Sequence, residues 1–307
     1  MKHWIEAARL RTLPLSVSGI IVGSVYAMSQ SMFNWKIIIF AFTTTLGFQV
    51  VSNFANDYGD GIKGTDNNDR IGPKRAIQSG VISPQSMRTA IILTSILTLI
   101  SAILLIYFSF KGKYLVYSLL FLILGIAAIA SAIRYTVGSG AYGYRGYGDV
   151  FVFVFFGWVS TLGIYFMYAK AMDWLLVLPA TAIGLLSVGV LNLNNMRDEA
   201  SDKKSNKNTI VVKIGGANAK KYHYFLIIFA MVLLMVFAIL NHFRLDQYLF
   251  LLVYIPLIQH LIRVYKNQEP KFLDPELKVL ALSTFALSLL LALCMIFFIS
   301  DVLVNNQ

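Results

Sequence analysis

The sequence predicts an all-α, polytopic membrane protein. Hydrophobic residues make up 57% of the 307 residues, whereas Asp, Glu, Lys and Arg together make up only 13%. With a mean hydropathy of +0.68, a water-soluble fold would leave too much apolar surface exposed. The apolar residues also fall into separate runs that approach the about 20 residues required for one membrane-spanning helix.

Nine such runs follow one another along the chain, which predicts a bundle of nine transmembrane helices. No long linker or low-complexity segment divides them, so we expect a single membrane domain over residues 1–307. The first run follows basic residues as a signal peptide would, but we expect it to be retained as a span. The predicted spans, in order, are 13–30, 35–53, 86–110, 114–132, 150–168, 174–193, 222–240, 247–264 and 279–299.

The basic residues are distributed unevenly between the two faces that nine spans define. The face that carries the N-terminus and the segments 54–85, 133–149, 194–221 and 265–278 holds 21 of the 26 Lys and Arg, with the adjoining helix ends counted. The positive-inside rule places this face, and the N-terminus, in the cytoplasm. The net charge of +11 then reflects topology. No nucleic-acid partner is expected, because the basic residues are spread over many loops.

Two acidic segments end the second and sixth spans and share the pattern N-[DN]-x-x-D. They read NDYGD from Asn56 and NNMRDEASD from Asn194, both on the predicted cytoplasmic face. If the helices continue through them, Asn56 and Asp60 share one helix face, and Asn194, Asp198 and Asp202 share another. The repetition suggests two related halves that face each other, with a site at their interface.

Carboxylates at membrane depth are costly unless they bind something, and the oxygen ligands gathered here are those that Mg²⁺ prefers. We therefore predict two Mg²⁺ ions with a diphosphate bridging them. The candidate metal ligands are Asn56, Asp57, Asp60, Asp66, Asn194, Asp198 and Asp202. The alternative is that these are ordinary loop charges, paired with Lys63, Arg70, Arg197, Lys203 or Lys204.

Basic residues follow both acidic segments in loops that Gly and Pro interrupt. Arg offers a two-pronged fork to phosphate oxygens and Lys a point charge, so we expect Lys63, Lys74 and Arg75 to meet a diphosphate. Lys207, after the second segment, could do the same. Topology or a solvated loop would explain any single one of them about as well.

A third hydrophilic segment, residues 134–149, is rich in Gly and Tyr. It could be a flexible interfacial loop with aromatic anchors. The functional interpretation is a lid that helps to exclude water and supplies Arg134, Tyr144 and Arg145 to the site.

Taken together, these segments resemble the UbiA superfamily of intramembrane aromatic prenyltransferases over nearly the whole chain. The resemblance is closer to its 1,4-dihydroxy-2-naphthoate branch than to its 4-hydroxybenzoate branch. Gly64 stands where the superfamily's first motif usually has a carboxylate, and Asp66 comes two residues later. The motifs that carry the resemblance are RTLPLSV from Arg11, NDYGDGIKGTD from Asn56, RIGPKRAIQSG from Arg70, YTVGSGAYGYRGYGDVFVFVFFG from Tyr135 and LNLNNMRDEASDKKSNKNTIVVKIGG from Leu191.

The resemblance implies helices around a central cavity that opens sideways to lipid. It implies transfer of an all-trans polyprenyl group from polyprenyl diphosphate to 1,4-dihydroxy-2-naphthoate with loss of carbon dioxide. The product would be demethylmenaquinol or demethylmenaquinone, made for menaquinone in a bacterial cell membrane, with the site facing the cytoplasm. The residues expected to act in catalysis are Asp60, Arg75, Asp198 and Asp202.

Other functions remain open at this point. A related prenyltransferase could use 4-hydroxybenzoate, homogentisate or haem as the acceptor. A cation- or proton-coupled transporter would also need intramembrane carboxylates, but it would leave the basic loops beside them without a purpose. A purely structural membrane protein would not require two matching acidic helix ends.

Overall fold

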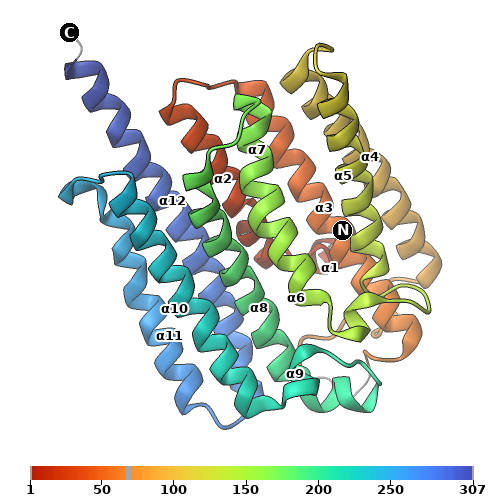
Figure 1. Ribbon diagram of the computed structural model, residues 1–307. Coiled ribbons are helices and arrows are strands. Elements are labelled where there is room, and N and C mark those ends of the chain that lie inside the picture. Colours follow the sequence, from red (N-terminus) through yellow and green to blue (C-terminus); the bar gives the residue numbers. More distant parts are fainter. Residues whose placement is uncertain (1, 67–70, 306–307) are drawn as a thin grey trace.

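The computed structural model describes residues 2–66 and 71–305, which form helices joined by short loops, with no β-strand among them. The long helices run side by side in a bundle (Figure 1). In the described ranges, eight helical segments are long and apolar enough to cross a membrane, and α1 and α2, bent by 53° where they meet, pass the same test together. The predicted all-α class is therefore confirmed, and the eight to nine candidate spans of the described ranges agree with the predicted nine.

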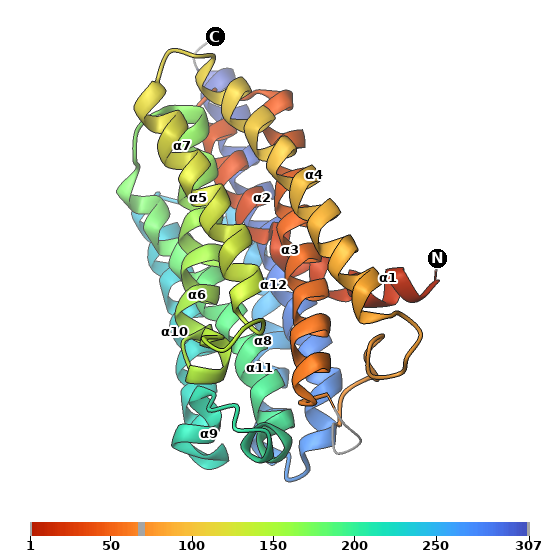
Figure 2. The same ribbon diagram turned by 90° about the vertical axis from the view of Figure 1, so that its right-hand side faces the viewer.

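The N-terminal part of the chain supplies the helices on one side of the bundle. Helix α1 projects from this side at an angle to α2, and Arg9 between them has a left-handed backbone conformation, φ 51° (Figure 2). Helices α3, α4 and α5 pack against one another. The bounds are α1 Lys2–Ala8, α2 Leu13–Ser29, α3 Trp35–Lys63, α4 Pro84–Phe110 and α5 Leu115–Arg134.

The C-terminal part repeats this arrangement on the other side. Helix α8 packs against α10 much as α3 packs against α4, and α12 packs against both α8 and α2. This correspondence supports the predicted relation between two halves. The bounds are α6 Gly148–Val152, α7 Ser160–Ala169, α8 Val177–Lys204, α9 Ile210–Ile214, α10 Gly216–Leu240, α11 Tyr254–Lys266 and α12 Leu273–Asn305.

Helices α3 and α8 continue well beyond their predicted spans, which ended at 53 and 193. The charged residues lower the local hydropathy, but they do not interrupt the helix. Helix α3 ends only at Gly64, whose left-handed φ of 71° suits a residue without a side chain. Both acidic segments are therefore helical, as their spacing assumed.

The predicted span 150–168 is not one regular helix. A π-helical stretch, Phe153–Val159, separates α6 from α7. There the chain approaches α8 closely, because a Cβ on Gly157 would lie 2.7 Å from the carbonyl oxygen of Ala180. Stretches of π-helix are rare and often found at functional sites, and this one contributes aromatic side chains to the cavity described below.

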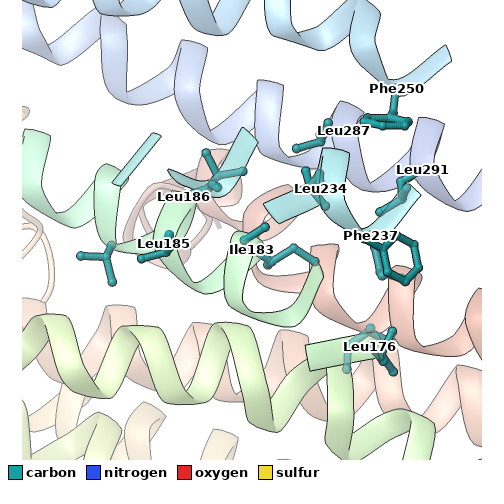
Figure 3. Packing of buried hydrophobic residues seen from close by; sticks show 14 of the residues in the cluster. Leu176, Ile183, Leu185, Leu186, Leu234, Phe237, Phe250, Leu287 and Leu291 are labelled. Carbon is teal, nitrogen blue, oxygen red and sulfur yellow. The ribbon is translucent and has the colours of Figure 1, made fainter. Parts of the chain in front are cut away.

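The main apolar core lies between α8, α10 and α12, as Figure 3 shows. Leu186 of α8, Phe237 of α10 and Leu291 of α12 are almost completely buried there. The opposite side of the bundle is built differently. Helix α5 has no fully buried residue, and it exposes large apolar side chains such as Val116, 76% exposed. An apolar exposed face of this kind is what a lipid environment requires.

A buried polar network joins α10, α11 and α12. Nε2 of His223 lies 2.9 Å from Nε2 of His260, and Nδ1 of His260 contacts the Glu276 carboxylate. Arg263 donates to the same carboxylate, with its Nη2 at 3.1 Å. This network is not visible in the sequence, because the two histidines are on different helices and show no ligand spacing.

We expect Glu276→Ala to destabilise the protein by about 3 kcal/mol, because it leaves buried His260 without its acidic partner. The matched control is Glu269→Ala, since Glu269 pairs with Lys271 at an exposed position and should change stability by no more than about 0.5 kcal/mol. Thermal denaturation of the purified proteins in detergent measures both effects. Equal midpoints for the two variants would show that the network contributes nothing to stability.

Candidate active site at the polar end of a central cavity

A cavity of about 390 Å³ lies inside the bundle and is lined by residues of α2 to α8 and α12. Most of its wall is apolar or aromatic, with Leu105, Phe121, Phe155, Phe156 and Met167 among its lining residues. One end is strongly polar, and most of the predicted site residues line it. These are Asn56, Asp60, Asp66, Arg75, Asn194, Asp198, Asp202 and Lys207.

The first acidic segment forms the last turns of α3. Asp60 is buried, with 8% of its surface exposed, and its Oδ1 accepts a hydrogen bond from the Tyr144 hydroxyl at 2.7 Å. The same hydroxyl lies 2.6 Å from Oγ1 of Thr65. Asp66 follows in the turn after α3, and its carboxylate lies 3.8 Å from Nε of Arg75. Asp60 is thus held by Tyr144, a residue from outside its own helix.

The second acidic segment forms the last turns of α8. Asp198 receives two hydrogen bonds from Arg197, whose guanidinium is almost completely buried. Nη2 of Arg197 also donates to Oδ1 of Asn194 at 2.8 Å. Asp202 lies one turn further along the helix. Its Oδ2 is buried and has no hydrogen-bond partner in the part of the chain that the structure describes.

Lys207 connects the two segments. The chain turns back after α8, and the Lys207 amide donates to the carbonyl oxygen of Asp202 at 2.8 Å. Its Nζ lies 3.5 Å from Oδ1 of Asp202 and 3.9 Å from Oδ2 of Asp60. Burial alone would lower the pKa of Lys207, but the two carboxylates outweigh burial and raise it above the ordinary value. A permanently charged ammonium therefore lies between the two helix ends.

The Gly- and Tyr-rich segment closes over this end through Tyr144. Nζ of Lys63 lies 4.1 Å from the centre of the Tyr144 ring, and Nζ of Lys207 lies 5.6 Å from it. The Tyr144 carbonyl oxygen accepts from the Asn208 amide at 3.0 Å, which joins the segment to the loop after α8. Burial, and then the charge of Asp60, raise the pKa of Tyr144, so its hydroxyl stays protonated and donates.

We expect Tyr144→Phe to lower the turnover rate about tenfold, because Asp60 loses a hydrogen bond to its charged form worth about 1.5 kcal/mol. The ring, and with it the contacts to Lys63 and Lys207, would remain. Tyr147→Phe is the matched control, since Tyr147 belongs to the same segment but is 57% exposed. The measurement is the steady-state rate of the prenyl transfer that the sequence predicts, for each of the two purified variants. Equal rates would show that the Asp60 contact has no part in activity.

Several predicted site residues lie elsewhere. Asp57 does not line the cavity: its carboxylate accepts from the backbone amides of Ala76 and Ile77, at 3.1 and 3.3 Å, so the structure does not bring it together with the other predicted metal ligands. It fastens the loop that carries Arg75. The other predicted site residues that are exposed and absent from the cavity lining are Lys63, Lys74, Arg134 and Arg145. Arg70 lies outside the described residues.

Arg197 and its second partner, Asp274, are the main site residues that the sequence did not reveal. Arg197 belongs to the second motif, where the sequence suggests for it only a pairing with loop charges. Asp274 is in neither motif. Nη1 of Arg197 contacts Oδ1 of Asp274 at the start of α12. An arginine within an acidic motif was the available signal, but its partner Asp274 comes from another helix.

The residues at this end suit Mg²⁺ only in part. Their donors are carboxylate and amide oxygens, and the partnerless Oδ2 of Asp202 is the kind of atom that a metal would complete. No group of three or more His, Cys, Asp or Glu side chains in the described ranges is close enough to hold an ion alone. Mg²⁺ would therefore need phosphate oxygens and water in addition to the protein.

These features define a membrane protein whose cavity suits a molecule with a charged head and a long apolar tail. The chain belongs to the UbiA prenyltransferase family, whose model matches residues 16–273.

Two relatives agree with this assignment, and a solved structure shares the fold. The chain is 42% identical to the 1,4-dihydroxy-2-naphthoate octaprenyltransferase of Escherichia coli strain K12, over 90% of this chain and 89% of that one. It is 39% identical to the Haemophilus influenzae protein of the same name, over 95% of each. The fold matches the apo structure of a UbiA homolog from Aeropyrum pernix K1, with a TM-score of 0.70, 14% identity and coverage of 94% of this chain and 98% of that one.

Proposed function

We propose that this protein transfers a polyprenyl group from polyprenyl diphosphate to 1,4-dihydroxy-2-naphthoate, a step of menaquinone biosynthesis. The observation that carries the proposal is the meeting of the two acidic helix ends at Lys207, at the polar end of an otherwise apolar cavity. The similarity to two naphthoate octaprenyltransferases over nearly the whole chain supports the choice of acceptor.

The polar end would take the diphosphate of the donor. Arg75 and Lys207 both line it and provide positive charge for phosphate oxygens. Asn56, Asp60, Asn194, Asp198 and Asp202 would hold Mg²⁺, with Asp66 beside them. When bound, Mg²⁺ would neutralise the charge that develops on the diphosphate as the carbon–oxygen bond breaks. The basic residues would stabilise the same charge from the protein side.

The apolar part of the cavity would take the prenyl chain. When the allylic carbon–oxygen bond breaks, its electron pair leaves with the diphosphate and an allylic cation remains. Aromatic side chains line the cavity, among them Phe121, Phe151, Phe155 and Phe156, and they would keep water from that cation. The electron-rich naphthoate ring would then attack it, and the carboxyl group would be lost as carbon dioxide and a proton, which restores the aromatic ring.

The protein would lie in a bacterial cell membrane with its site facing the cytoplasm. The structure provides eight to nine helical segments of spanning length within the described ranges. The excess of Lys and Arg on the face that carries both acidic segments supports a cytoplasmic site, with the N-terminus inside. The bacterial origin of the two relatives supports a bacterial cell membrane as its location.

The test is transfer of a radiolabelled polyprenyl diphosphate by membranes that contain the protein. The acceptors are 1,4-dihydroxy-2-naphthoate and 4-hydroxybenzoate, each with Mg²⁺ and with a chelator. We expect labelling of the naphthoate alone, and its loss with chelator. Labelling of 4-hydroxybenzoate instead would move the protein to another acceptor. No labelling, together with ion flux in vesicles, would favour a transporter.

A further inference from the structure

We infer that Asp274, at the start of α12, is a positioning residue for the second acidic segment. It holds the guanidinium of Arg197, which in turn holds Asp198 and Asn194. The inference rests on the proposed function, in which Asp198 and Asn194 bind the metal. Position 274 lies one residue beyond the stretch that the family model matches.

Arg197 uses two of its guanidinium nitrogens, Nε and Nη2, to fix the ligand side of α8. Its Nε donates to Oδ1 of Asp198 at 2.8 Å and its Nη2 to Oδ2 at 2.6 Å, so the carboxylate is gripped by both oxygens. Nη2 also reaches Asn194 one turn earlier. With 1% of its surface exposed, Arg197 has almost no contact with solvent. Its orientation therefore sets where the oxygens of two candidate ligands lie.

The helix by itself does not explain that orientation. Side chains at successive positions of an α-helix point in different directions and do not face each other. Helix geometry alone therefore does not bring the side chains of Arg197 and Asp198 into contact. The contact from Nη1 of Arg197 to Asp274 comes from a different helix and fixes the plane of the guanidinium. Asp274 thus determines how Arg197 meets Asp198.

The charges give Asp274 a second effect. One arginine between two carboxylates leaves a net negative charge, so Asp198 remains attractive to a cation although it is paired. If Asp274 were neutral, Arg197 would balance the charge of Asp198 alone in a buried place, and a metal would be attracted less. Asp274 therefore favours metal binding without touching the metal.

The first turn of α12 is well suited to hold the Asp274 carboxylate against Arg197. A carboxylate in the first turn of a helix is stabilised by the helix dipole. Two residues further on, Glu276 ties the same turn to α11 through His260 and Arg263. Asp274 is therefore presented from a turn that is anchored to another helix.

The experiment compares binding of Mn²⁺, as a spectroscopic substitute for Mg²⁺, to the purified full-length protein in the presence of inorganic diphosphate. Electron paramagnetic resonance gives the free Mn²⁺ for wild type, Asp274→Asn, Asp274→Glu and the control Asp246→Asn. Asp246 pairs with Arg244 at an exposed position, and neither residue lines the cavity. We expect Asp274→Asn to weaken Mn²⁺ binding about tenfold or more, Asp274→Glu to restore part of it, and Asp246→Asn to match wild type.

The outcomes separate this inference from the proposed function. If wild type binds Mn²⁺ and transfers prenyl groups, and Asp274→Asn binds Mn²⁺ equally well, the inference is overturned and the proposed function stands. A lower thermal midpoint with unchanged Mn²⁺ binding would mean a structural role only, and would also overturn it. If wild type binds no Mn²⁺, the metal part of the proposed function fails together with the inference. Should Asp274→Asn not fold, Asp274→Glu against wild type carries the comparison.

Discussion

Asp202→Asn is expected to lower prenyl transfer by about a thousandfold or more while the protein stays folded in the membrane. Among the residues that the structure describes, one buried oxygen of this carboxylate has no hydrogen-bond partner and the other lies 3.5 Å from Nζ of Lys207, so the carboxylate is available to a cation. An amide of the same shape cannot neutralise Mg²⁺, and the loss of a metal contribution of about 4 kcal/mol corresponds to that factor. Asp60→Asn should behave alike, since Asp60 faces the same ammonium.

The measurement is the rate of labelled product formation by purified protein, together with the thermal midpoint without Mg²⁺. Because each substitution removes one of two carboxylates that lie near each other, the midpoint without metal should not fall. The control is Asp246→Asn, the same type of substitution at an exposed position, which should leave both the rate and the thermal midpoint unchanged. Substantial residual activity in both Asp202→Asn and Asp60→Asn would rule out a site built on these two carboxylates.

Lys207→Met is expected to reduce the specificity constant for the donor about 10- to 100-fold. The ammonium lies between Asp202 and Asp60, so its loss leaves two carboxylates without their shared counter-charge. It also removes a cation from the place proposed for the diphosphate. A charged hydrogen bond of about 1.5–3 kcal/mol corresponds to this range.

Two further variants show whether the charge or the shape of Lys207 is responsible for its effect on donor binding. Lys207→Arg keeps the charge and should retain more activity than Lys207→Met. Lys203→Met removes an exposed lysine from the end of α8 and should leave the donor kinetics unchanged. Donor titrations at saturating acceptor give the values. If Lys207→Met and Lys203→Met gave the same donor kinetics, Lys207 would have no role in donor binding.

The helices and the acidic columns were predictable because both depend on local spacing. Runs of apolar residues identify spans, and the i and i+4 positions of Asn56 and Asp60 place them on one helix face wherever the helix continues. The structure shows that α3 does continue, to Lys63. Hydropathy alone ended the span at 53. The Asn, Asp and Gly residues that follow lower helix propensity as well as hydropathy, so the helix continues there against its intrinsic propensity.

The roles of individual charges were less predictable, because they depend on partners distant in the sequence. Asp57 has the same residue type as Asp60, yet it faces the loop after α3 and caps the backbone of Ala76. Arg197 was visible as a charge, but its use depends on Asp274, 77 residues later. Tyr144 was predicted to reach the site. The sequence could not show that its hydroxyl meets Asp60.

The exposed helix α5 has a consequence for how the two proposed products separate. One face of α5 is bare of protein, and its other face lines the cavity with Phe121, Gly125 and Ala128, so a single helix stands between cavity and lipid. Carrying each five-carbon unit of a prenylated quinol into water would cost about 4 kcal/mol, from about 0.8 kcal/mol per CH₂. The quinol would therefore partition past α5 into the bilayer, while the diphosphate leaves through the polar loops into water. Release of the two products into different solvents would hinder their recombination.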